Sequence, residues 1–151
     1  MTSVTIAELL ARASDFEARL ERCYAEIRDA TRDNGVKLLT YYLSRHRRHL
    51  AQALEGLDAL KIGRINRVRL KFDVDLDSSL ASSLLGHPAE TITSAELLAA
   101  AVDVDSTLID LYTGILAQPV GPDAAPLFES LVKIEERDVV MLRKMIAMNY
   151  F

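Results

Sequence analysis

Six ionisable side chains of the types that bind metal ions lie within apolar stretches of this chain. Four are carboxylates and two are imidazoles: Glu17, His46, His49, Asp105, Glu135 and Asp138. Carboxylate oxygens and imidazole nitrogens are the ligands that iron, manganese and zinc commonly take in proteins. A carboxylate that is buried without compensation costs several kcal/mol or becomes protonated. If these groups share one interior, they therefore bind either a metal ion or one another.

The carboxylates of the first and third predicted helices lie in the middle of an apolar stripe. On a helical wheel, Glu17 falls within about 20° of Tyr24, and Asp105 stands in the same relation to Tyr112. We expect both carboxylates to point toward the molecular axis, with the two tyrosines as neighbours that surround the ligands.

The second and fourth predicted helices each carry a pair of ionisable groups three residues apart. His46 and Glu135 lie within about 20° of the apolar residues of their stripes. His49 and Asp138 lie about 60° to one side, at the margin of the stripe. We expect the four central groups, one from each helix, to meet inside the molecule.

The elements that position these groups are predicted from the spacing of apolar residues. Spacings of three and four predict helices at about 5–32, 36–61, 93–117 and 123–149. Short links join the first helix to the second and the third to the fourth, whereas a long crossover at 62–92 joins the two pairs. This pattern predicts an all-α fold over 1–151 as one domain, an antiparallel four-helix bundle made of two helical hairpins.

The two predicted hairpins are similar in sequence. Thr5 and Glu8 have the spacing of a capping box that begins a helix, and the pattern returns 88 residues later as Thr93 and Glu96. An acid followed seven residues later by tyrosine also occurs in both halves. We therefore predict that the chain contains a duplicated helical hairpin.

The patterns of the second and fourth helices resemble a known family. They read Leu39-x-x-Tyr42-Leu43-x-x-His46-x-x-His49 and Phe128-x-x-Leu131-Val132-x-x-Glu135-x-x-Asp138. Both resemble helices of the ferritin-like superfamily, especially its rubrerythrin and bacterioferritin members, in which Glu-x-x-His occupies this frame. The resemblance implies a ferritin-like bundle that binds two iron or manganese ions for oxidation, peroxide reduction or iron storage. It also implies that Glu17 and Asp105 are the single carboxylate ligands of their helices.

The ligand pattern departs from that of the family. This chain has His-x-x-His on one helix and Glu-x-x-Asp on the other, and a neutral imidazole binds one ion where a family glutamate bridges two. One interpretation is a remodelled centre of a non-haem metal oxidoreductase, with Glu17, His46, His49 and Glu135 as ligands of iron, manganese or zinc. The other is a non-catalytic module for dimerisation or for binding a ligand or partner, in which a protonated His46 pairs with Glu17 and Glu135 without metal.

One segment, at 65–77, has the period of a β-strand. Apolar residues alternate there with three bases and then three acids, and no second strand is visible in the chain. Antiparallel pairing with the same segment of a second copy, centred on Phe72, would place opposite charges across the two strands. We therefore expect either a homodimer joined by this ribbon or an extended crossover that lies over the bundle.

Composition excludes several classes of protein. The chain has 151 residues, half of them apolar, with a net charge of −4 and one cysteine, Cys23. This balance excludes a disordered chain and a disulfide scaffold, and the acidic charge argues against a nucleic-acid binder. No apolar run approaches the length of a membrane span, so we expect a cytoplasmic protein without membrane or nucleic-acid partners.

Overall fold

The computed structural model of the protein describes residues 2–45, 49–72, 76, 84 and 86–148. These residues are mostly helical, with one small sheet. The elements in chain order are β1 (Thr2–Thr5), α1 (Ile6–Ala30), α2 (Asn34–Arg45), α3 (His49–Glu55), α4 (Ala59–Asn66), β2 (Arg69–Phe72), α6 (Ser94–Leu116) and α7 (Gly121–Ala147).

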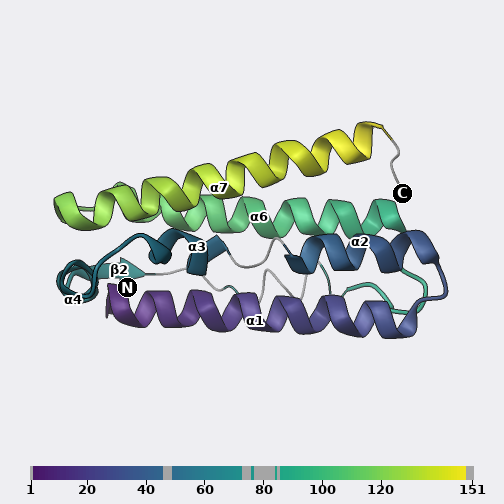
Figure 1. Ribbon diagram of the computed structural model, residues 1–151, viewed down its shortest axis with the longest axis horizontal. Coiled ribbons are helices and arrows are strands. Elements are labelled where there is room, and N and C mark those ends of the chain that lie inside the picture. Colours follow the sequence, from purple (N-terminus) through teal and green to yellow (C-terminus); the bar gives the residue numbers. More distant parts are fainter. Residues whose placement is uncertain (1, 46–48, 73–75, 77–83, 85, 149–151) are drawn as a thin grey trace.

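The long helices lie alongside one another. Helices α1, α6 and α7 follow the long axis of the molecule, and α2 and α3 occupy one row between α1 and α6 (Figure 1). Helix α6 packs against α7, α1 packs against α2, and α3 contacts α7. The predicted all-α fold is therefore confirmed as far as the described residues are mostly helical, although they also form a two-stranded sheet, and the four-helix bundle stays a prediction.

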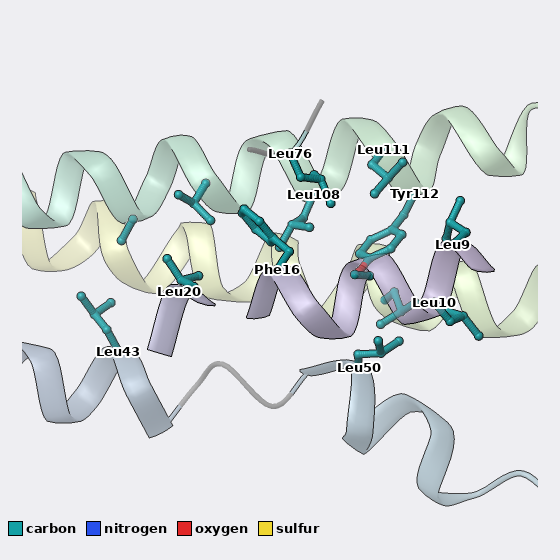
Figure 2. Close-up of a cluster of buried hydrophobic side chains, with 14 of the residues drawn as sticks. Leu9, Leu10, Phe16, Leu20, Leu43, Leu50, Leu76, Leu108, Leu111 and Tyr112 are labelled. Carbon is teal, nitrogen blue, oxygen red and sulfur yellow. The ribbon is translucent and has the colours of Figure 1, made fainter. Parts of the chain in front are cut away.

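Apolar side chains from α1, α2, α3 and α6 converge on one interior. Figure 2 shows Phe16 and Leu20 of α1, Leu43 of α2 and Leu108 of α6 turned toward one another, and all four side chains are buried. The aromatic rings of Tyr112 and Phe128 join α6 to α7, with centroids 6.1 Å apart.

Among the described residues, no helix has both the length and the apolarity needed to cross a bilayer.

Two threonines begin long helices, as their spacing to the following glutamates predicts. The Thr93 hydroxyl accepts a hydrogen bond from the Glu96 backbone N–H at 3.1 Å, and the Thr93 N–H donates to the Glu96 carboxylate at 3.0 Å. At α1, the Thr5 hydroxyl accepts a bond from the Glu8 N–H at 3.2 Å. Each cap satisfies backbone donors that the first turn of a helix leaves without an intrahelical acceptor.

The prediction of one continuous helix over 36–61 is wrong. Helix α3 ends at Glu55, and α4 begins at Ala59. The Asp58 carboxylate caps α4 by accepting a bond from the Lys61 N–H at 2.7 Å. Gly56 therefore follows the end of one helix, and Asp58 caps the start of the next. Helix α4 extends into the region that was predicted as crossover.

The β-segment has a partner within the chain, contrary to the prediction. Strand β2 pairs antiparallel with β1, and Val4 faces Leu70 in the register. Both of these side chains are almost fully buried, which places this face of the sheet against the core. The sequence Thr2–Thr5 contains a single large apolar residue, so it is too short for an alternation to be recognised.

The other edge of β2 is occupied by a side chain. The Lys71 N–H donates to Gln118 Oε1 at 2.9 Å, and Gln118 Nε2 donates to the Lys71 carbonyl at 2.7 Å. An intermolecular ribbon through Lys71 would have to displace Gln118. The acids of the proposed ribbon at 73, 75 and 77 lie outside the described residues, so the homodimer stays a prediction.

The capping box at Thr93 gives a stability prediction. Replacing Thr93→Ala should lower the free energy of unfolding by about 1 kcal/mol, because the Glu96 N–H loses its acceptor. Urea unfolding at neutral pH measures this change. Thr91→Ala, at an exposed threonine just before the helix, is the control and should have little effect.

The same cap predicts a pH dependence. Hydrogen bonds from Thr93 to the Glu96 carboxylate lower the pKa of Glu96. The stability gained from this carboxylate is therefore present above its ordinary pKa, and it is lost as the pH falls through the lowered pKa of the folded state. The difference in the free energy of unfolding between the wild-type protein and Glu96→Gln should shrink as the pH falls. A difference that stays constant between pH 7 and pH 2 would contradict this prediction.

The bonds from Gln118 to β2 give a third prediction. In Gln118→Ala, hydrogen exchange at the Lys71 amide should become roughly tenfold faster, because its acceptor is lost. Gln118→Glu keeps an acceptor but loses the donor, so it should be intermediate. Amide exchange followed by NMR measures both variants, with Gln52→Ala at an exposed glutamine of α3 as the control. An unchanged Lys71 amide in Gln118→Ala would contradict the role of this side chain.

Candidate metal centre

Three buried side chains from two helices form a group of the kind that holds a metal ion. His49 is the first residue of α3, and Glu135 and Asp138 lie one turn apart on α7. Each offers one ligand atom, and these atoms lie within 4.8 Å of one another. Two ligands of one tetrahedral ion with bonds of about 2.1 Å lie about 3.4 Å apart. The most distant of these atoms would therefore have to move inward to bind the same ion as the others.

His49 and Glu135 are in direct contact. The His49 Nδ1 atom lies 2.8 Å from Glu135 Oε1, and both side chains are buried. An ionised carboxylate can only accept, so Nδ1–H is the donor. An ion shared by His49 and Glu135 would take the place of this proton, with Nδ1 as the ligand atom of the imidazole.

The charge of the group suits one divalent ion. Glu135 and Asp138 carry two negative charges when both are ionised, and a neutral His49 adds none. Their side chains are at most 6% exposed, so water screens this charge poorly. A divalent cation would neutralise the group. Without one, a protonated His49 would compensate one of the two carboxylates.

The residues predicted on α1 and α6 are also buried. Glu17 is 7% exposed and Asp105 is 1% exposed, and both tyrosines that follow them, Tyr24 and Tyr112, are essentially inaccessible. Neither carboxylate belongs to the group formed by His49 with the two acids of α7. His46 lies outside the described residues, so its expected place in the centre is not described.

His49 and Asp138 lie deeper than the helical wheel predicted. The wheel treated 36–61 as one helix, which placed His49 at the margin of the stripe. His49 is nevertheless only 4% exposed. On α7, residues three apart lie on the same face, and this buried face is wide enough to include Asp138 as well as Glu135.

Tyr42 is a neighbour of the centre that the sequence analysis did not assign to it. Burial, together with the negative charge of Asp138, raises the pKa of the Tyr42 hydroxyl. The side chain is half-buried on α2, so this helix also contributes a polar group close to the carboxylate. The sequence feature that could have indicated this position is a tyrosine within an apolar stripe, four residues before His46.

Comparison with known proteins gives no match. No protein-family model, no curated protein and no solved structure matches this chain. The function is therefore inferred from the residues and their arrangement.

The contact between His49 and Glu135 predicts a large effect on stability. In protein freed of metal with a chelator, His49→Ala should lower the free energy of unfolding by about 3 kcal/mol, because it leaves a buried carboxylate uncompensated. The double variant with Glu135→Gln should recover part of this loss. Urea unfolding of the two single variants and of the double variant measures the coupling energy between His49 and Glu135.

The second histidine pair supplies the control for this measurement. His87 contacts Glu96 at 3.1 Å, but about a third of the His87 side chain is exposed. His87→Ala should cost less than about 1 kcal/mol. If His49→Ala and His87→Ala lose the same free energy of unfolding, the buried contact contributes no more to stability than the partly exposed one.

Proposed function

We propose that this protein binds one divalent metal ion between α3 and α7 through His49, Glu135 and Asp138. The observation that supports this most strongly is the buried group itself, whose three ligand atoms lie within 4.8 Å of one another. Burial makes uncompensated carboxylates costly, and a divalent ion removes that cost.

The ligand types indicate the metal. Imidazole and carboxylate ligands without thiolate suit zinc, iron and manganese. Three protein ligands leave a coordination position for water or substrate, as in catalytic rather than structural metal sites. A bound ion would polarise that molecule as a Lewis acid, and iron or manganese would add redox chemistry. The residues of this chain would hold the ion, and His49 Nδ1 and Glu135 Oε1, which lie 2.8 Å apart without it, would both bind it.

We further infer that the protein is a ferritin-like bundle whose centre has been remodelled from two metals to one. The paired threonine caps and the paired acids and tyrosines of α1 and α6 support a duplicated hairpin. The change from two metals to one is supported by His46, which occupies the position of a family glutamate that bridges two ions. An imidazole binds one ion only. Glu17 and Asp105 then remain as buried acids of the ancestral arrangement.

The second candidate is a non-catalytic helical module with a metal-free polar network. The bond between His49 and Glu135 supports it, because the two side chains satisfy each other without an ion. In this case the buried polar group contributes to the specificity of packing, and the module binds a partner or a small molecule elsewhere on its surface.

Metal titration separates the two candidates. Protein freed of metal should bind Zn²⁺ with one ion per chain in calorimetry, and Co²⁺ should produce visible absorption bands typical of nitrogen and oxygen ligands. His49→Ala and Asp138→Asn should each weaken binding at least about 100-fold, because the loss of a direct ligand exceeds the effect of an outer hydrogen bond.

Two matched variants control for general effects of the substitutions. His87→Ala removes a histidine far along the chain from the centre, and Glu136→Gln changes an exposed acid beside Glu135 on the same helix. Both should bind Zn²⁺ like the wild-type protein. If the wild-type protein binds no Zn²⁺, Co²⁺, Fe²⁺ or Mn²⁺, or if the control variants lose as much affinity as His49→Ala, the metal centre is excluded and the metal-free module stands.

A further inference from the structure

Helix α7 carries two apolar side chains on the face that is turned away from the core. Val140 is 67% exposed and Met141 is 47% exposed. On a helical wheel, the buried Leu131 and Leu142 lie at least about 160° from Val140. Helix α7 forms one edge of the molecule (Figure 1), so the face around Val140 is open to a partner.

Three exposed cations surround these two apolar side chains. Lys133, Arg137 and Lys144 lie within about 60° of Val140 on the wheel. All three line one hollow of the surface together with Val140 and Met141. We call these five residues the α7 outer face.

The charge on this side of α7 is opposite to that of the chain. The exposed ionisable residues between 133 and 144 are four cations and one acid, with a net charge of +3: Lys133, Glu136, Arg137, Arg143 and Lys144. The chain as a whole has a net charge of −4. The acids of the metal-binding group, Glu135 and Asp138, lie on the buried side of the same helix. Electrostatic complementarity therefore favours a partner that carries acids.

The spacing of the α7 outer face defines the shape of that partner. The face contains Arg137-x-x-Val140-Met141-x-x-Lys144, a cation and apolar pattern that is the same in both directions. Its two cations are separated by about 10.5 Å along the helix axis. A helix with the pattern Glu-x-x-Leu-Leu-x-x-Glu has the same spacing. Its carboxylates would meet Arg137 and Lys144 while its leucines cover Val140 and Met141, in either direction.

We propose that the α7 outer face binds an acidic amphipathic helix of a partner protein. The partner has two carboxylates two turns apart and apolar residues between them. Amphipathic helices are commonly recognised through apolar anchors three and four residues apart. Met141 suits such a surface, because the flexible thioether side chain adapts to different apolar neighbours.

Two other occupants fit this face less well. Two copies joined through it would each bring a net charge of +3 to the contact, and like charges across an interface are unfavourable. An anionic bilayer attracts cations, but binding to it also scales with the apolar area that enters the bilayer. Val140 and Met141 offer little such area, and the net charge of −4 on the chain opposes an anionic surface.

The proposed metal centre is not needed for this interaction. Val140 and Met141 lie outside the group formed by His49, Glu135 and Asp138. The test uses the protein as purified and measures peptide binding alone. If it fails, the metal centre is still judged by its own titration.

The probes are three alanine-based peptides of about sixteen residues, each stapled on the face away from the contact so that it is helical. One carries Glu-x-x-Leu-Leu-x-x-Glu, and the others carry glutamine or lysine in place of the glutamates. In NMR titrations at low salt, the glutamate peptide should bind at least about tenfold more tightly than the glutamine peptide. The lysine peptide should not bind. The amide signals of residues 137–144 should shift, and the preference for glutamate should decrease as salt is added.

Three variants locate the binding. The double variant Arg137→Gln with Lys144→Gln should weaken the glutamate peptide about tenfold, to the affinity of the glutamine peptide. The double variant Arg32→Gln with Lys37→Gln removes the same charge at exposed cations elsewhere and should bind like the wild-type protein. Val140→Gln should weaken both peptides. Val140 is exposed, so this variant should fold normally, as its unfolding curve can show.

Several results would overturn the proposal. It fails if the glutamate peptide shows no saturable binding, if the lysine peptide binds as tightly, or if the shifted signals belong to another helix. It also fails if the control double variant loses as much affinity as the variant of Arg137 and Lys144. Self-association in sedimentation that Val140→Gln abolishes would assign the face to a second copy instead. Flotation with phosphatidylserine vesicles that requires Arg137 and Lys144 would assign it to a membrane.

Discussion

Burial of charge is the constraint on which this structure depends most. The interior contains carboxylates from α1, α6 and α7, and the bond between His49 and Glu135 compensates one of them. This bond joins α3 to α7 across 86 residues of sequence. A short helix of seven residues has little intrinsic stability, so its position relies on such tertiary contacts, to which Leu50 adds apolar burial.

The sequence allowed the long helices and their caps to be predicted, because their apolar spacing and the threonine–glutamate pairs agree with each other. It did not allow the break at Gly56 and Asp58 to be recognised, since apolar residues continue on both sides and hide the local stop signal. Burial of Glu17, Asp105 and Glu135 followed from their place among apolar neighbours. His49, Glu135 and Asp138 were all among the predicted metal-binding residues, but their grouping without Glu17 and Asp105 depends on tertiary packing that a helical wheel does not describe.

Thr5 belongs to two elements at once, as the last residue of β1 and the cap of α1. The strand therefore passes into the helix without a linker, and its partner is more than sixty residues further along the chain. Such a contact closes a long loop of chain, which is entropically costly to form early. The sheet should accordingly be among the last parts of the molecule to assemble, after the helices that bring its two strands together have docked.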